Sequence, residues 1–243
     1  YTLAVKGDED AVGTYQFKLW EVLPPQNFTF AVGDTVTQDQ PGAGAGNIES
    51  PGSQDIYTFA ATAGQTVYFD AQGGTFYMRW SVVDAAGTVI FDGGRMVTDA
   101  GIFTLTQGGT YTLAVKGDED AVGTYQFKVW EVPPPQNFTF AIGDMVTQDQ
   151  PGAGAGNIES PGSQDIYTFE AAPGQQVTFD AQDGSFYLRW SVTDAAGTVI
   201  FDGGRMTDDP LTLTLEQGGT YTVMIYGDED AVGTYRFQIM EQR

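Results

Sequence analysis

The chain has 243 residues, of which 41% are hydrophobic and 13% aromatic, enough to build packed cores. Its formal net charge of −22, from 32 acidic and 10 basic residues, excludes nucleic acids and anionic membrane surfaces as partners, because both require Lys and Arg. The absence of Cys and His excludes disulfides, thiolate or imidazole metal sites and histidine-based catalysis.

A long internal repeat organises the chain. The stretch YTLAVKGDED begins at Tyr1 and again at Tyr111, and a related stretch begins at Tyr221, which gives a period of 110 residues. Residues 25–133 align with 135–243 without a gap and are identical at 81 of 109 positions. We therefore expect two repeats, 25–134 and 135–243. Residues 1–24 match 111–134 at 22 of 24 positions and are expected to be the C-terminal hairpin of a truncated preceding repeat.

Apolar residues alternate with polar ones in several short segments of each repeat. In chain order, the residues predicted to share a buried face are Tyr57 and Phe59; Val67 and Phe69; Phe76, Met78, Trp80 and Val82; Tyr111, Leu113 and Val115; and Tyr125, Phe127 and Val129. Period-two alternation is typical of β-strands with one buried face, and the segments are separated by Gly-rich turns. The pattern predicts an all-β fold of tandem antiparallel, jelly-roll-like β-sandwich modules with about eight strands each.

The stretch GNIESPGSQDIYTF, residues 46–59, offers the first candidate site and returns unchanged at 156–169. Asn47, Glu49 and Asp55 place three oxygen-bearing side chains beside a strand start. Ca²⁺ takes six to eight oxygen ligands, so this loop is a candidate calcium site. Alternatively, Asn and acidic side chains shape the turn through bonds to nearby backbone amides. The same two interpretations apply to the repeated set, which comprises Asn157, Glu159 and Asp165.

A second acidic cluster is the GDEDAVG loop, with acids at 8–10, 118–120 and 228–230. It resembles the opening of an EF-hand, but Val12 and Leu19 occupy positions that need oxygen ligands. Because it lies between two alternating segments, we expect it to be a solvated hairpin loop.

Tyr77 and Arg79, repeated as Tyr187 and Arg189, are the candidates for ligand contact. Arg and aromatic residues are enriched at binding surfaces. The alternative is a cross-strand pair on the solvent face of a sheet.

Five motifs occur in order along each repeat: in the first they are D-x-Y-x-F (55–59), A-G-Q-x-V (63–67), D-x-x-G (84–87), G-G-T-Y-T (108–112) and G-T-Y-x-F (123–127). This order resembles the bacterial pre-peptidase C-terminal domain family. The resemblance implies a jelly-roll-like sandwich without catalysis, found beside secreted proteases or in tandem arrays of surface proteins. It also implies similarity in fold to the collagen-binding domains of clostridial collagenases, which bind Ca²⁺. Asp55 matches their strand-start Asp, whereas Gly52 stands where they have an acid.

These observations predict a non-catalytic module of a large secreted or cell-surface bacterial protein. We expect it to act as a semi-rigid spacer or stalk, stiffened at the Pro-rich joint 133–137 and stabilised by calcium. The alternative is an adhesive module that binds polysaccharide or an extracellular protein. Neighbouring repeats are the expected partners, together with self-association through sheet edges. No apolar run reaches the roughly 18 residues of a membrane span, so membrane insertion of this segment is not expected.

Overall fold

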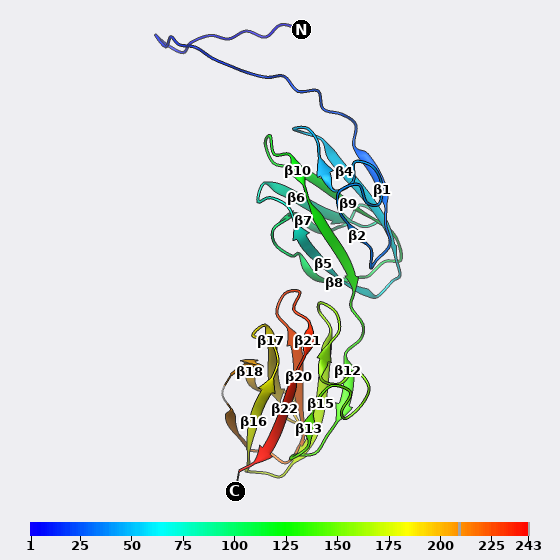
Figure 1. The fold of residues 1–243 in the computed structure, drawn as a ribbon, viewed down its shortest axis with the longest axis vertical. Helices are drawn as coiled ribbons and strands as arrows, with labels where there is room; N and C mark the ends of the chain where they lie inside the picture. The colour runs from blue at the N-terminus through cyan, green and yellow to red at the C-terminus, as the bar shows by residue number, and fades with distance from the viewer. Residues whose placement is uncertain (209, 243) are drawn as a thin grey trace.

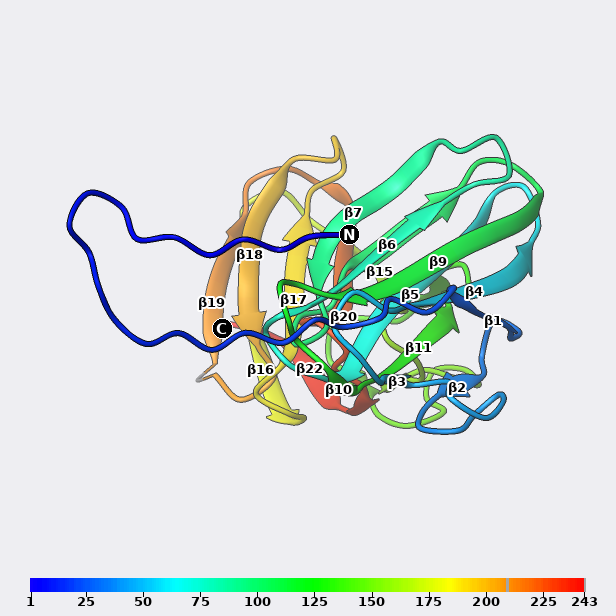
Figure 2. The ribbon, with the colours of Figure 1, turned by 90° about the horizontal axis from the view of Figure 1, so that it is seen from above.

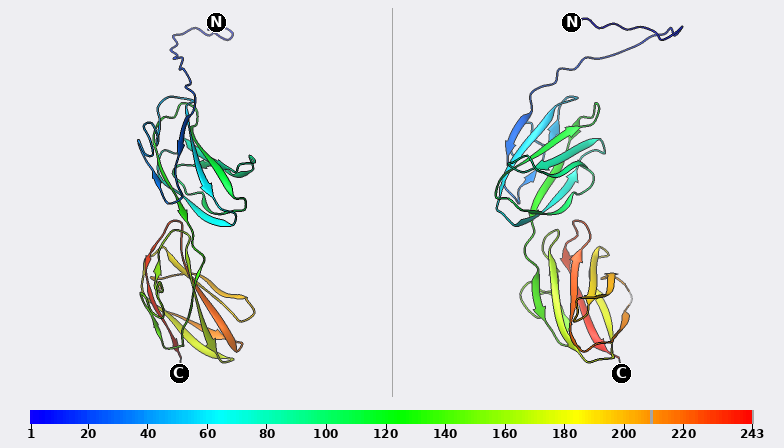
Figure 3. Two further views of the ribbon diagram at one scale, coloured as in Figure 1. Left: turned by 90° about the vertical axis from the view of Figure 1, so that its right-hand side faces the viewer. Right: turned by 180° about the vertical axis from the view of Figure 1, so that it is seen from behind.

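The computed structural model describes residues 1–208 and 210–242. This part of the chain consists of β-strands and loops, with no α-helix, so it holds no helix that could span a membrane. Each repeat folds into its own β-sandwich, and the two sandwiches are stacked end to end (Figure 1 and Figure 3). We call residues 25–134 module 1 and residues 135–243 module 2. The predicted all-β fold of tandem sandwiches is confirmed.

Module 1 contains two facing sheets and a short strand pair. The five-stranded sheet has the order β1 (Gln26–Thr29), β4 (Gln54–Ala61), β9 (Gly109–Gly117), β6 (Met78–Val83) and β7 (Val89–Arg95). The four-stranded sheet has the order β2 (Thr35–Val36), β11 (Gln126–Glu131), β5 (Gln65–Gly73) and β8 (Gly101–Leu105). The short pair joins β3 (Asn47–Ile48) to β10 (Gly123–Thr124). Eight of these strands have four or more residues, as the sequence predicts.

Module 2 repeats this topology. Its five-stranded sheet contains β12 (Gln136–Thr139), β15 (Gln164–Ala171), β20 (Gly219–Gly227), β17 (Leu188–Thr193) and β18 (Val199–Arg205). Its four-stranded sheet contains β13 (Met145–Val146), β22 (Arg236–Glu241), β16 (Gln175–Asp183) and β19 (Leu211–Leu215), and β14 (Asn157–Ile158) pairs with β21 (Gly233–Thr234).

Each module has a separate hydrophobic core between its sheets, and the predicted alternation describes it well. Tyr57, Phe59 and Trp80 are among the buried core residues of module 1. The prediction for Phe76 was wrong, because 52% of its surface is exposed. Strand β6 begins only at Met78, whose amide donates to Thr75 O (3.0 Å) in the preceding turn. Instead, the guanidinium of Arg95 covers the Phe76 ring at 3.3 Å.

The strands on either side of the GDEDAVG loop do not form the predicted hairpin. Strand β9 pairs with β4 and β6, whereas β11 pairs with β2 and β5 in the opposite sheet. The loop 118–122 therefore crosses from one sheet to the other at the end of the sandwich where the chain enters the module. A second departure from the antiparallel expectation is the edge strand β1, which pairs parallel to β4.

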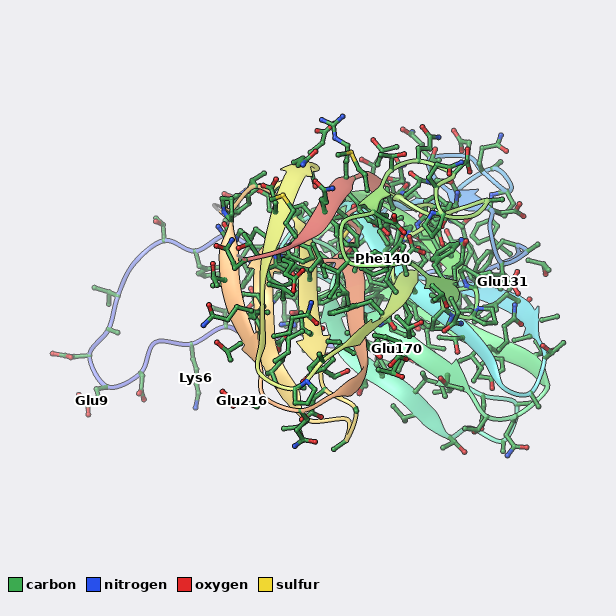
Figure 4. The ribbon with its side chains drawn as sticks, turned by 90° about the horizontal axis from the view of Figure 1, so that it is seen from below. Lys6, Glu9, Glu131, Phe140, Glu170 and Glu216 are labelled. Carbon is green, nitrogen blue, oxygen red and sulfur yellow. The ribbon has the colours of Figure 1, made fainter. Side chains whose placement is uncertain are left out.

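Residues 1–24 contain no strand, so the predicted hairpin is not formed there either. Most of the segment extends away from both modules (Figure 1 and Figure 2), although Val22 reaches Gly52 of module 1. Lys6 and Glu9 project from the segment into solvent (Figure 4). Residues 111–134 have nearly the same sequence as 1–24, and they form strands only by pairing with other strands of module 1.

Because, within 1–208 and 210–242, no strand of one module pairs with a strand of the other, the modules are expected to unfold separately. Phe69→Ala removes a fully buried ring from module 1 and should cost module 1 about 3–5 kcal/mol. Calorimetry should then show one of two transitions move to lower temperature. The matched variant Phe179→Ala should move the other transition, and a common shift of both transitions would show that the modules unfold as one unit.

Candidate functional site

A buried chain of hydrogen bonds lies where the candidate calcium loop enters the sandwich. The amide of Gly46 donates to the hydroxyl of Tyr57 (2.8 Å), and the hydroxyls of Tyr57 and Tyr125 are 2.7 Å apart. Tyr125 donates to the carboxylate of Asp55. Because the single hydroxyl hydrogen of Tyr125 is used for Asp55, Tyr57 donates to Tyr125. The chain therefore runs in one direction, from the loop amide to the carboxylate.

This relay ties the two sheets together. Asp55 and Tyr57 lie on β4 of the five-stranded sheet, and Tyr125 directly precedes β11 of the four-stranded sheet. Module 2 contains the same arrangement: Gly156 donates to Tyr167 (2.8 Å), and Tyr235 donates to Asp165. The carboxylates of both modules are only 1% exposed. Such buried carboxylates need donors, which the tyrosines supply.

Burial raises the pKa of Asp55 to about 6, against the opposing effect of the Tyr125 hydroxyl. The nearby carboxylate of Glu49 raises it further, while the backbone amide of Asn47 lowers it. In module 2, burial likewise raises the pKa of Asp165 to about 6, with Glu159 in the place of Glu49. Burial also raises the pKa of Tyr125, so its hydroxyl remains a donor at neutral pH.

The three predicted metal-ligating residues of each loop thus lie at one corner of the module, but in different environments. Asn47 is half-buried in β3, Glu49 is exposed and Asp55 is buried, and Asn157, Glu159 and Asp165 repeat this arrangement. The side chain of Glu159 also accepts a hydrogen bond from Gln136 (3.0 Å). Only the Glu carboxylate of each set is directly open to solvent.

The predicted contact residues belong to a row of cations on the outer face of the five-stranded sheet. Arg79 is directly opposite Arg95 on one side and Lys116 on the other. Arg79 bonds Asp118 at 2.6 Å and Gly93 O at 3.0 Å, so its guanidinium is engaged within the module. Tyr77 is 57% exposed beside this row. Arg189 pairs in the same way with Asp228, and Tyr187 is similarly exposed.

Carboxylates also gather where the modules meet, which the sequence analysis missed. One oxygen each from Asp70, Asp99 and Asp230 lies within 4.8 Å of the others, and Asp230 belongs to module 2. Asp70 accepts bonds from Trp130 (2.9 Å) and Gln72 (2.8 Å). Burial raises the pKa of Asp99, and the charges of Asp70 and Asp230 raise it further. Such a group could offer oxygens to a cation, but no pattern in one repeat could reveal it, because it spans two.

No family model matches the chain, and no curated protein matches it. Solved structures with a similar arrangement include PliG of Aeromonas hydrophila, a periplasmic inhibitor of g-type lysozyme, with 13% identity, a TM-score of 0.34 and coverage of 45% of this chain and 100% of that one. Another is the pre-peptidase C-terminal domain of collagenase from Bacillus anthracis, with 12% identity, a TM-score of 0.33 and coverage of 44% and 97%. The CUB1-EGF-CUB2 domains of human MASP-1/3 match at 12% identity and a TM-score of 0.28, covering 86% and 99%.

Removing one hydroxyl from the relay tests its contribution to stability. Tyr125→Phe leaves the buried carboxylate of Asp55 without its side-chain donor and should lower the free energy of unfolding of module 1 by about 2–3 kcal/mol. Tyr111→Phe is the matched control, because Tyr111 is equally buried but donates only to Gln107 O (2.7 Å). It should cost about 1 kcal/mol. Urea unfolding measures both, and equal costs would contradict the assignment.

The raised pKa of Asp55 and Asp165 predicts an unusual pH dependence. The folded state binds a proton more tightly than the unfolded state, so stability falls as pH rises from about 4 through about 6. Acidification from pH 7 to pH 5 should therefore stabilise each module by about 1 kcal/mol. Thermal unfolding should show higher midpoints at pH 5, and Asp55→Asn combined with Asp165→Asn should flatten the response. An unchanged slope in that variant would assign the effect to net charge instead.

Proposed function

We propose that this chain is a non-catalytic spacer that holds other parts of a secreted or cell-surface protein apart. The observation that carries this proposal is the path of the chain: it enters each module at one end and leaves at the opposite end (Figure 1). Modules connected in this way add their lengths rather than folding back on each other. A nearly identical repeat suits this role, because the number of modules sets the length.

The connection between the modules is short and stiff. Strand β11 ends at Glu131 and β12 begins at Gln136, and three of the four intervening residues are Pro133, Pro134 and Pro135. Consecutive prolines favour an extended backbone with few alternatives. The cleft beside this connection is lined by residues of both modules, including Gln65, Ile102 and Gln164.

An adhesive module for polysaccharide or an extracellular protein is the second candidate. Phe76 and Tyr77 are both more than half exposed beside the cation row of Arg95, Arg79 and Lys116. Aromatic rings and guanidinium groups are common at the centre of binding interfaces. The internal bonds of Arg79 and Arg95 favour the spacer, since both guanidinium groups already have partners. Binding to glycan or collagen arrays that is lost in Tyr77→Ala with Tyr187→Ala would favour the adhesive role.

We also propose calcium as a stabiliser, bound at the loop of Asn47, Glu49 and Asp55 and at its copy in module 2. Three side-chain oxygens fall short of the six to eight that Ca²⁺ takes, so backbone carbonyls and water would complete the set. Burial is the main cause of the raised pKa of Asp55, and the nearby charge of Glu49 adds to it. That repulsion supports this proposal, since a cation would relieve it.

The spacer proposal predicts a fixed separation between the modules. The chain contains no Cys, so spin labels can be placed at Val89→Cys and Val199→Cys, which occupy equivalent exposed positions. Double electron–electron resonance should give one narrow distance distribution. Replacing Pro133, Pro134 and Pro135 by Gly should broaden it, because Gly-rich linkers are flexible. A broad distribution in the unmodified linker would contradict the proposal.

The calcium proposal predicts that thermal unfolding shifts between millimolar Ca²⁺ and excess EDTA at fixed ionic strength. Binding at about 100 times Kd adds roughly 2.7 kcal/mol, which corresponds to a rise of roughly ten degrees for a module of this size. The variant Glu49→Gln with Glu159→Gln should abolish the shift while leaving the tyrosine relay intact. If the wild-type midpoint does not move, the calcium proposal is wrong, and Glu49 and Asp55 have structural roles in the loop and the core.

A further inference from the structure

The two modules meet through surfaces that can be compared between the repeats. We call the end of a module that faces the following one its tail, defined in module 1 by Tyr68, Ile102, Trp130 and Val132. We call the opposite end its head, defined in module 2 by Gly162, Gly227, Glu229 and Asp230. Three tail residues and three head residues line two clefts at the junction: Tyr68, Ile102, Val132, Gly162, Gly227 and Glu229.

The tail of module 1 is an apolar row across three strands. Tyr68 lies directly opposite Ile102 on one side and Trp130 on the other, on the outer face of the four-stranded sheet. A Cβ added to Gly162 would lie 3.0 Å from the Ile102 side chain and 3.2 Å from that of Val132. The glycine therefore lets the head of module 2 approach the row closely.

In module 2 three of the four residues of this row are polar, and the fourth, Met240, is apolar with 37% of its surface exposed. Thr178, Thr212, Met240 and Gln242 replace Tyr68, Ile102, Trp130 and Val132. The hydroxyls of Thr178 and Thr212 are 3.1 Å apart, and Gln242 donates to Thr178. These substitutions are concerted, because the new polar groups satisfy one another on a surface that no further module covers in this structure.

Sequence differences between the two modules are frequent in the tail and absent from the head residues at the junction. Within 25–133, 13 residues line the two clefts, and nine of them differ in module 2, compared with 28 of 109 positions in the whole repeat. Five residues of module 2 line the same clefts, and all five are identical at the equivalent positions of module 1. Module 1 therefore has the same head as module 2, but the two modules have different tails.

The head of module 1 is defined by Gly52, Gly117, Glu119 and Asp120, and among the described residues no module covers it. Gly52 is exposed, whereas its equivalent Gly162 is half-buried beneath the tail of module 1. Val22 reaches Gly52 as Val132 reaches Gly162: an added Cβ on Gly52 would lie 3.0 Å from Val22. Residues 1–24 also carry Trp20 and Val22, the residues of an apolar tail.

We propose that the head of module 1 is a docking surface for an apolar module tail of the type in module 1, and that module 2 caps such a stack because its polar tail does not dock. The partner is a module of this same kind. Its tail would cover the head with Tyr, Ile, Trp and Val side chains in the arrangement seen at the junction between modules 1 and 2. The inference refines the proposed spacer but is tested separately from it.

The test converts the cap into a docking tail in the full chain. Thr178→Tyr, Thr212→Ile, Met240→Trp and Gln242→Val give module 2 the tail of module 1, and the fold tolerates these residues because module 1 carries them. The variant then presents an apolar tail at one end and, at the other, a head that Val22 alone is seen to reach. A contact between such a tail and the head of another chain would be a head-to-tail contact that does not close. In 150 mM NaCl, which screens the junction carboxylates, sedimentation equilibrium should show an average mass that at least doubles with concentration, while the wild type remains monomeric.

The control adds Gly52→Ala to the converted chain. The added methyl group would meet the incoming tail, so association should weaken several-fold. Because Gly52 has a φ of +83°, the methyl group also strains its turn, and Gly52→Ala in the unconverted chain measures that cost separately. Circular dichroism and calorimetry check that both modules remain folded. A converted chain that stays monomeric would overturn the proposal. Association that Gly52→Ala leaves unchanged would also overturn it, because the new apolar row would then be sticking non-specifically.

Discussion

The burial of one carboxylate in each module is the constraint on which the rest of the structure depends. Asp55 is held inside the sandwich by a tyrosine from the opposite sheet, and that tyrosine is held by Tyr57 and the amide of Gly46. A charge in that position is tolerated only if its donors are all in place. The relay therefore fixes the loop 46–53 and the start of β11 relative to each other. The loop 46–53 contains the head residue Gly52, and the crossing loop 118–122 contains Glu119 and Asp120.

Much of the fold follows from the sequence, because a strand with one buried face has a period of two and Gly-rich turns end each strand. The buried role of Asp55 was also implicit, since Asp55, Tyr57 and Phe59 lie on the same side of one strand. What the pattern could not give was the partner. Tyr125 is 70 residues away, and only the pairing of strands shows that it faces Asp55. The hairpin predicted around the GDEDAVG loop was wrong for the same reason. Two neighbouring strands with period-two alternation have the same sequence pattern whether they pair with each other or belong to opposite sheets.

The junction shows why comparison of repeats adds information that one repeat lacks. Residues that are identical in two recent copies reflect common descent and say little about function. The location of the differing residues in the structure is more informative. Here they are enriched on one face of one module, where nine of 13 cleft residues differ against 28 of 109 in the whole repeat, and the opposing cleft residues do not vary. An apolar row at the end of a module needs a cover to remain out of water, and at the junction Tyr68 is only 3% exposed while Ile102 is 49% exposed. The Thr and Gln side chains of module 2 remove that need, in the same way that capping repeats end other arrays with a polar surface.

The parallel edge strand has a mechanical consequence. Tension applied to the two ends of a module pulls β1 along β4 and β11 along β5, since the chain enters at one end of the sandwich and leaves at the other. The hydrogen bonds between these strands lie across the direction of pull, so they are loaded together in shear. A hairpin pulled from its open end instead loses its bonds one at a time. The first and last long strands of module 1, β1 and β11, belong to different sheets. Both therefore lie where a stalk under tension must resist extension.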